Sequence, residues 1–161
     1  MTVIRILGRE EKDVACTGCF PLGDNFKWFA AGKLHREDDL PAVVSLNGTR
    51  RWFLRGLCHR ANDSPAVVKS NGDQFWYVQG KLHRDGDLPA YVAANGKRTW
   101  YRRGLCHRDD DQPAAVYPDG TLMWFREGLR HRDNDLPAVI HPDGACAWFV
   151  GGNCMPRKYM P

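Results

Sequence analysis

Histidine–arginine pairs occur five times in this chain, and each pair is followed three residues later by an aspartate. Histidine and aspartate are common acid–base catalysts, and both are zinc ligands. Each copy supplies one histidine and one aspartate, too few for a zinc site, and an active site is seldom copied five times with every residue intact. We predict structural loops, in which aspartate binds arginine or backbone groups and histidine packs beside a tryptophan, and no enzyme activity. The copies are His35-Arg36 with Asp39, His59-Arg60 with Asp63, His83-Arg84 with Asp87, His107-Arg108 with Asp111, and His131-Arg132 with Asp135.

Two of the six cysteines form the sequence Cys16-Thr17-Gly18-Cys19. This C-x-x-C spacing occurs in zinc and redox sites, but a zinc ion needs two further ligands. The candidates for those ligands are His35, Cys146 and Cys154. We predict a reduced cysteine pair and no cofactor, with zinc held by Cys16 and Cys19 as the alternative.

Arginines and aromatic residues are interleaved in two stretches, 50–55 and 97–103, and basic residues recur at Arg126. Such a stripe suits phosphate binding and base stacking, and it equally suits the hot spot of a protein interface. Acidic runs at 37–39 and 109–111 leave a net charge of only +4, which is low for a dedicated nucleic-acid binder. We predict a protein partner, with nucleic acid or an anionic surface as the alternative; a merely solvated strand face stays open. The predicted binding residues are Arg51, Arg55, Arg98, Trp100, Arg102, Arg103 and Arg126.

All six tryptophans lie 24 residues apart without insertion or deletion, so the elements that position these side chains must repeat with the same period. A glycine, the histidine–arginine pair, the aspartate, a Pro-Ala pair and an Asn-Gly or Asp-Gly pair recur at the same step. This pattern predicts an all-β, single-chain solenoid of 24-residue β-hairpins that form a meandering antiparallel sheet. The tryptophans are Trp28, Trp52, Trp76, Trp100, Trp124 and Trp148.

The Asn-Gly and Asp-Gly pairs predict the tight turn of each hairpin. A two-residue type I′ turn needs positive φ at both central residues, which these pairs tolerate. With Asn47-Gly48 as that turn, Val44 pairs with Arg51, Val43 with Trp52, and Ala42 with Phe53. Alternation then predicts a core face with Ala42, Val44 and Phe53 and a partly solvated face with Val43 and Trp52.

The segment between hairpins, such as 56–65, is rich in turn formers and offers no helical period. The sheet must therefore be covered by its own loops, by its twist or by a partner, and a homodimer is one way to supply that cover. Residues 1–25 align as a degenerate amino-terminal cap repeat. Residues 26–152 hold five hairpin repeats and the start of a sixth, and residues 153–161 form a carboxyl-terminal cap or tail, because terminal repeats lack one neighbour.

Cys58, Cys106 and Cys154 occupy the repeat position that holds Leu34 and Leu82 in two other repeats. This exchange predicts that they act as small hydrophobic residues. Equivalent residues two repeats apart are separated by about 19 Å, which is too far for a disulfide.

The repeat W-[FY]-x-x-G-x-x-H, with a second strand ending in Asp-Gly, resembles MORN and related hairpin repeats. Residues 76–84, Trp-Tyr-Val-Gln-Gly-Lys-Leu-His-Arg, are similar to a divergent variant, W-Y-x-x-G-K-L-H-R-x-x-x-P-A, of tailed phages and large DNA viruses. The similarity covers residues 26–152. It implies a non-catalytic binding scaffold encoded by a virus or phage, which blocks a host defence or regulatory protein or, alternatively, cements the virion.

Composition narrows the class of protein. The chain has 161 residues, of which 43% are hydrophobic, 26% charged and 11% aromatic, typical of one globular domain and unlike a disordered chain. No apolar run approaches the ~18 residues of a membrane helix, and charges interrupt the apolar patch at the amino terminus. We therefore predict a cytoplasmic protein without a membrane span, located in the host cytoplasm if it is viral.

Overall fold

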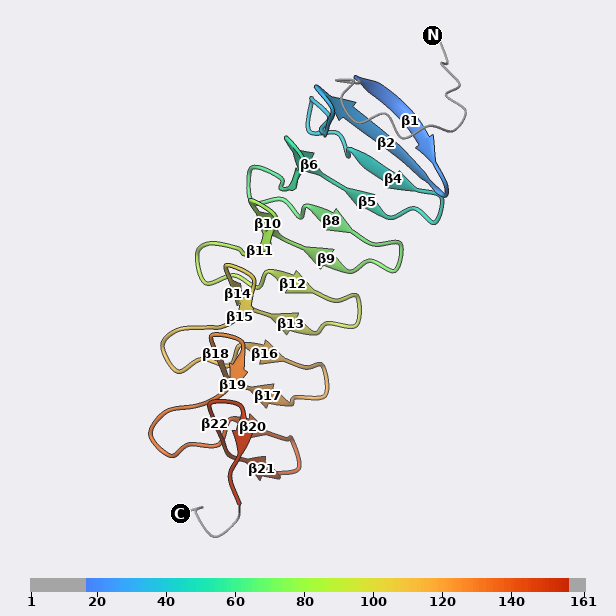
Figure 1. The fold of residues 1–161 in the computed structure, drawn as a ribbon. Helices are drawn as coiled ribbons and strands as arrows, with labels where there is room; N and C mark the ends of the chain where they lie inside the picture. The colour runs from blue at the N-terminus through green and yellow to red at the C-terminus, as the bar shows by residue number, and fades with distance from the viewer. Residues whose placement is uncertain (1–16, 157–161) are drawn as a thin grey trace.

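The computed structural model describes residues 17–156, and in this part of the chain there are strands and turns but no helix. Thirteen strands form one antiparallel main sheet that runs the length of the molecule (Figure 1). Beside it stands a column of separate two-stranded hairpins, which we call the short hairpins. The predicted all-β, meandering hairpin solenoid is confirmed. No helix among these residues is long and apolar enough to cross a membrane.

The strands of the main sheet pair in the order in which they occur in the chain, and each repeat contributes two of them. The exception is β3, which pairs with β2 only. After the first two, the strands are only two or three residues long, because each repeat must turn three times within 24 residues. The strands are β1 (Gly18–Leu22), β2 (Asn25–Ala30), β3 (Lys33–Leu34), β4 (Val43–Ser45), β5 (Arg50–Arg51), β8 (Val67–Val68), β9 (Gln74–Phe75), β12 (Tyr91–Val92), β13 (Arg98–Thr99), β16 (Ala115–Val116), β17 (Leu122–Met123), β20 (Val139–Ile140) and β21 (Cys146–Ala147).

The short hairpins are formed by residues that the sequence pattern assigned partly to the connecting loop. The first part of the predicted loop 56–65 is in fact a strand, because Phe53 pairs with Cys58 and Leu54 with Leu57. The short hairpins are β6 (Phe53–Leu54) with β7 (Leu57–Cys58), β10 (Tyr77–Val78) with β11 (Lys81–Leu82), β14 (Tyr101–Arg102) with β15 (Leu105–Cys106), β18 (Phe125–Arg126) with β19 (Leu129–Arg130), and β22 (Phe149–Val150) with β23 (Asn153–Cys154).

The turn of each main-sheet hairpin differs from the prediction. Val44 pairs with Arg50 and Val43 with Arg51, one residue away from the predicted register. The N–H of Ser45 donates to the carbonyl of Thr49, which leaves a three-residue loop, 46–48. Only Gly48 has positive φ there, +88°, while the side-chain oxygen of Asn47 accepts the N–H of Thr49 at 2.9 Å. A three-residue loop ending in a left-handed glycine is the next most common hairpin connection after the two-residue turn.

This shift of one residue moves the side chains of the second strand to the opposite face relative to those of the first. Trp52 now pairs with Ala66, through its N–H to the Ala66 carbonyl at 2.8 Å, and lies on the same face as Ala42. Both residues are buried, Ala42 completely and Trp52 with 6% exposure. The predicted core face of Ala42, Val44 and Phe53 and the partly solvated tryptophan face were therefore wrong: the Trp-Ala columns form the core.

Two-residue turns with positive φ at both positions do occur, but in the short hairpins. Arg55 and Gly56 have φ of +50° and +87°. The same pair of conformations recurs in the following repeats, at Gln79-Gly80, Arg103-Gly104, Glu127-Gly128 and Gly151-Gly152. Here the right-handed twist of a two-stranded ribbon matches the type I′ turn, as the general rule for hairpins requires. Each turn glycine also donates its N–H to the previous short hairpin, as Gly104 does to Leu82 at 2.7 Å.

At the amino terminus, the described part of the predicted cap 1–25 forms the five-residue strand β1, which pairs with β2 along its whole length. Residues 1–16 lie outside the described residues. At the other end, Asn153 and Cys154 of the predicted tail belong to the last short hairpin. The repeat pattern therefore continues at least to residue 154.

Candidate functional site

The recurring aspartate joins successive repeats through a three-residue contact that we call the clamp. In one copy, the backbone carbonyl of Asp87 accepts the indole N–H of Trp100 at 2.9 Å. The Asp87 carboxylate takes two hydrogen bonds from the guanidinium of Arg108, each 2.8 Å long. Arg108 lies over the Trp100 ring, 3.9 Å from its centroid. A bidentate arginine stacked on an indole is a planar, well-defined arrangement that lysine cannot reproduce.

The same clamp occurs in four repeats with almost constant distances. The prediction that the aspartate binds arginine is confirmed. The arginine of each clamp also donates to the backbone carbonyl of the proline in the Pro-Ala pair; Arg108, for example, donates to the Pro113 carbonyl at 3.4 Å. The clamps are Asp39 with Trp52 and Arg60, Asp63 with Trp76 and Arg84, Asp87 with Trp100 and Arg108, and Asp111 with Trp124 and Arg132.

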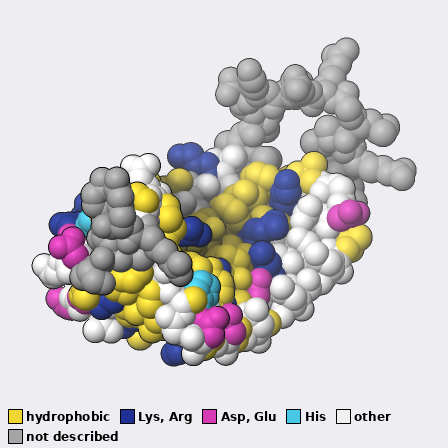
Figure 2. All heavy atoms as spheres, turned by 90° about the horizontal axis from the view of Figure 1, so that it is seen from below, with side chains coloured by type: hydrophobic (Ala, Val, Ile, Leu, Met, Phe, Trp, Pro, Cys, Tyr) yellow, Lys and Arg dark blue, Asp and Glu magenta, His cyan; other side chains and the backbone are white. Residues whose placement is uncertain are grey.

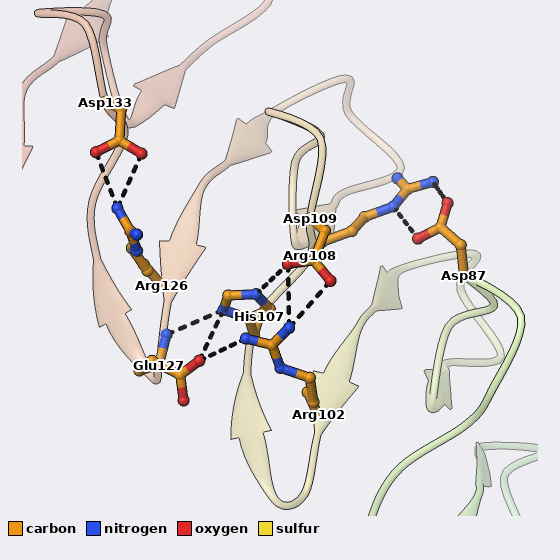
Figure 3. A network of polar contacts seen from close by, with 8 residues as sticks. All are labelled: Asp87, Arg102, His107, Arg108, Asp109, Arg126, Glu127 and Asp133. Atoms are coloured by element: carbon orange, nitrogen blue, oxygen red, sulfur yellow. Dashed lines mark hydrogen bonds and ion pairs between the residues drawn. The ribbon is translucent and has the colours of Figure 1, made fainter.

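Four of the five histidines of the His-Arg pairs contact the following short hairpin and a nearby carboxylate, whereas the buried Nδ1 of His59 has no hydrogen-bond partner among the described residues. The Nε2 atom of His107 is 2.8 Å from Asp109, and its Nδ1 accepts the N–H of Glu127 at 3.2 Å. Arg102 donates to both Asp109 and Glu127, so four charged or titratable side chains form one network (Figure 3). Hydrogen bonding to His107 and Arg102 keeps the pKa of Asp109 below its ordinary value. The other histidine–carboxylate pairs are His35–Glu37, His83–Asp85 and His131–Asp133.

A cavity of about 240 Å³ lies between two successive loops next to this network. Its lining includes His83, Asp87, Trp100, Arg102 and Asp109. Asp87 and Trp100 belong to a clamp, His83 and Asp109 to histidine–carboxylate pairs, and Arg102 bonds to Asp109 and Glu127. The polar groups of the cavity therefore act in joining the repeats.

Of the three cysteines that exchange with leucine, Cys58 and Cys106 are partly buried, as expected for hydrophobic positions, whereas Cys154 is exposed. Burial raises the pKa of the Cys58 thiol to about 11, with a smaller opposing effect of Arg51. Burial likewise raises the pKa of Cys106 to about 12, opposed by Lys97. Both thiols are therefore protonated and unreactive near neutral pH.

The alternative zinc site stays untested, because Cys16 lies outside the described residues. Cys19, on β1, is exposed. Between residues 17 and 156 no group of three or more His, Cys, Asp or Glu side chains is placed to hold a metal ion.

The structure does not bring the seven predicted binding residues together. Trp100 is 7% exposed and belongs to a clamp, so its ring faces no solvent that a partner could replace. Arg98 lies on the same main-sheet face as the tryptophans, whereas Arg51 lies on the opposite face. Arg55 and Arg103 occupy short-hairpin turns, and Arg102 and Arg126 share a short-hairpin face with Leu105 and Leu129.

Arg51 is part of a concave surface that the sequence did not reveal. The charge of Arg51 acts on the pKa of Cys58 and of Tyr77, which both belong to short hairpins. The main-sheet face that carries Arg51, which we call the inner face, is therefore turned toward the short hairpins. The pKa of Tyr101 is raised by burial and by neighbours that include Tyr91 and Tyr117 of the main sheet. We call the space between these two walls the trough. Figure 2 looks along it and shows a hollow lined by hydrophobic side chains and by Lys and Arg.

Aromatic rings and cations are in contact along the trough. Phe75 and Tyr91 are stacked, with ring centroids 4.6 Å apart. Lys97 lies 4.2 Å from the centroid of the Tyr117 ring, and its Nζ donates to the tyrosine hydroxyl at 3.0 Å. Lys69 lies 4.9 Å from the centroid of Phe75. Sequence reasoning missed this surface because its residues stand in variable positions of the repeat. The alternation of side chains between the two faces of each strand could have identified which of these residues point inward.

Comparisons of the chain with protein-family models, with curated proteins and with solved structures each found no significant match. The resemblance to MORN-like repeats therefore stays a prediction.

We predict that replacing the clamp arginine by lysine destabilises the protein even though the charge is kept. Arg108→Lys loses the bidentate contact with Asp87 and the stacking on Trp100, which should cost about 1 kcal/mol of unfolding free energy. Urea unfolding measures the change. Arg98→Lys, at an exposed site without a clamp, is the matched control and should change little. Equal effects of the two variants would contradict the clamp.

The clamps also predict a loss of stability in acid. The hydrogen bonds from Arg108 and Arg132 lower the pKa of Asp87 and Asp111 from 3.8. Because the folded pKa lies below the unfolded one, this stabilisation is complete above the unfolded pKa and is lost as pH falls through the folded pKa. The free energy of unfolding should therefore decrease as the pH falls below 3.8, the ordinary pKa of aspartate. Asp87→Asn should make this decrease less steep. Asp135→Asn is the control, because Pro156 stands where the clamp arginine would be; an equal flattening there would contradict the assignment.

Alkylation should separate the cysteines by their position. Iodoacetamide at mildly alkaline pH should label the exposed Cys146 and Cys154 rapidly and Cys106 slowly, because Cys106 is partly buried and its pKa is about 12. Peptide mass spectrometry of timed samples measures each rate. If Cys106 reacted as fast as Cys146 in the folded protein, the burial of its thiol would be disproved.

Proposed function

We propose that this protein is a non-catalytic scaffold that binds another protein in the trough. The observation that carries the proposal is the concave surface on which Arg51, Lys69 and Lys97 lie among phenylalanine and tyrosine rings. Arginine and aromatic residues in a concave, half-buried setting are typical of interface hot spots.

Most of the side chains suited to acid–base chemistry are engaged within the repeats, which supports a binding role. The aspartates of the clamps hold arginine and tryptophan, and four of the five His-Arg histidines hold a carboxylate and the next short hairpin. Protonation of the Cys58 and Cys106 thiols makes them poor nucleophiles. Rigid stacking of the repeats then presents the trough as a preformed surface, which lowers the entropic cost of binding.

The resemblance to repeats of phages and large viruses suggests which kinds of partner to test first. A virus-encoded scaffold of this type would block a host defence or regulatory protein, or cement the virion. Host cytoplasm is the proposed location for the first role. Both roles use the same binding surface, so the experiment below applies to either.

Affinity capture tests the proposal. The immobilised protein is exposed to a lysate of the cells in which it is naturally made, and bound proteins are identified by mass spectrometry. We expect one protein to be retained by the wild type and by an Arg50→Glu, Arg98→Glu variant, and to be lost with Arg51→Glu, Lys97→Glu. The control is matched, because Arg50 and Arg98 are adjacent to the trough residues but lie on the opposite face.

Three outcomes would contradict the proposal. If no protein were retained by any form, the scaffold role would fail. Loss of the partner after nuclease treatment would favour the nucleic-acid alternative. Retention by the trough variant but loss with Arg98→Glu, Arg102→Glu, Arg103→Glu would move the site to those predicted arginines that lie outside the trough.

A further inference from the structure

Near the carboxyl-terminal end of the array, a proline stands at the position of the clamp arginine. The indole N–H of Trp148 donates to the Asp135 carbonyl at 2.9 Å, the same distance as in the four complete clamps. Pro156 follows Arg132, the arginine of the preceding clamp, by 24 residues. The aspartate and the tryptophan are therefore in place without an arginine at its usual position. We call this pair, Asp135 and Trp148, the open clamp.

The backbone around the open clamp has the same conformation as in the complete clamps. Asp135 has φ of +54°, and the four aspartates of the complete clamps have φ between +50° and +53°. The N–H of Met155 donates to the Trp148 carbonyl at 2.9 Å, and the equivalent backbone bond is present in every preceding repeat. The geometry of the repeat is thus kept up to the residue before Pro156.

The charge and the ring of the open clamp are not compensated within the described part of the chain. Among residues 17–156, no nitrogen of Lys, Arg or His lies within 4.0 Å of the Asp135 carboxylate. None of the cations in this range lies over the Trp148 ring. Trp148 is partly exposed, whereas the tryptophans of the complete clamps are 6% to 8% exposed. An anion and an aromatic surface are therefore accessible together.

The complete clamps show which chemical group fits the open one. In each of them, Nε and Nη2 of arginine donate to the two carboxylate oxygens at 2.6 to 2.8 Å, as Arg108 does to Asp87 (Figure 3). The guanidinium carbon lies 3.9 to 4.0 Å from the centroid of the tryptophan ring. A planar guanidinium supplies both the paired donors and a face for stacking, which the ammonium group of lysine does not.

The open clamp is held in its binding geometry before any ligand arrives. The hydrogen bond from Trp148 fixes the indole relative to the loop. The side chain of His131 joins the same loop to the last short hairpin, because its Nδ1 accepts the Gly151 N–H at 3.3 Å and its Nε2 is 2.9 Å from Asp133. An incoming arginine therefore has to order little besides its own side chain, which lowers the entropic cost of binding.

We propose that the open clamp binds the side chain of an arginine that belongs to another protein. Its guanidinium donates two hydrogen bonds to the Asp135 carboxylate and stacks on the Trp148 ring. These two contacts alone give weak binding at an exposed site, so we assign the arginine to a protein, whose neighbouring residues add further contacts. The open clamp is separate from the trough, because the tryptophan column and Arg51 lie on opposite faces of the main sheet. The two sites are tested by different variants, and neither depends on the other.

Nuclear magnetic resonance of the whole protein tests the proposal. The six indole N–H signals are recorded during a titration with N-acetyl-arginine amide, and Trp148→Phe identifies the signal of Trp148. We expect this signal to shift progressively while those of the four complete clamps stay in place. N-acetyl-lysine amide has the same charge and should bind at least several-fold more weakly. Equal shifts with the two compounds would contradict a guanidinium site.

One pair of variants tests the carboxylate. Asp135→Asn keeps the backbone carbonyl that holds Trp148 but removes the charge, so affinity for N-acetyl-arginine amide should fall about tenfold or more. Asp110→Asn makes the same change of charge at an exposed residue next to a complete clamp, and it should bind as the wild type does. Unchanged binding by Asp135→Asn would overturn the proposal.

A second pair of variants tests the position of the missing arginine. Pro156→Arg supplies a guanidinium from the chain itself, so it should shift the Trp148 signal without ligand and abolish the response to N-acetyl-arginine amide. Pro156→Lys adds the same charge and should still respond. If Pro156→Arg bound the added compound as the wild type does, the site would lie elsewhere and the proposal would fail.

The source of the arginine is tested with the same signal. Arg157 lies outside the described residues, and Arg157→Gln should bind as the wild type does; binding by this variant alone would show that the chain fills its own clamp. A shift on dilution of the protein without ligand would show that a second copy supplies the arginine. Peptides with one arginine and varied flanking residues should include some that bind at least several-fold more tightly than N-acetyl-arginine amide. Failure of every such peptide to do so, or either of the first two results, would overturn the assignment to another protein.

Discussion

The hydrogen bond from a tryptophan indole to the carbonyl of an aspartate thirteen residues earlier is the contact on which this architecture depends. The same aspartate holds, through its carboxylate, an arginine twenty-one residues later. Both hydrogen bonds join one repeat to the next, and the arginine also stacks on the tryptophan. These three contacts can form together only when the three residues are separated by fixed numbers of residues along the chain. A single inserted residue would separate them. This constraint explains why the tryptophans follow one another at 24 residues without exception.

Backbone conformation prepares the aspartate for this double role. Asp87 has φ of +53°, in the left-handed region, and the preceding Gly86 is also left-handed. In the other repeats an aspartate or asparagine takes the place of that glycine, and these residues tolerate left-handed conformations better than other side chains do. Glycine would fit the second position as well, but it would supply no carboxylate. The left-handed backbone favours glycine at this position, whereas the contact with arginine requires a carboxylate, and aspartate meets both requirements.

Much of the fold was accessible from the sequence, because the clamp leaves regular marks. The period, the hairpins and the bond between aspartate and arginine were all predictable from residues that recur. The register was not. A glycine after Asn47 satisfies either a two-residue turn or the last position of a three-residue loop, and the two differ by one residue. That single step decides whether Trp52 or Phe53 shares a face with Ala42. The short hairpins were missed because a two-residue strand has too few residues to show alternation.

The same reasoning explains why the candidate site was hidden. Residues that recur in every repeat are occupied by the clamp and by the turns, so they cannot distinguish this protein from any other array built in the same way. Position 51 and its equivalents vary instead: Arg51, Phe75, Thr99, Met123 and Ala147 follow one another along the inner face. Such variation is compatible with a fixed backbone because the side chains at this position take part in neither the clamps nor the turns, although Thr99 is buried and Phe75 stacks on Tyr91. A surface whose backbone is fixed and whose side chains vary is the part of a repeat protein on which recognition can be built.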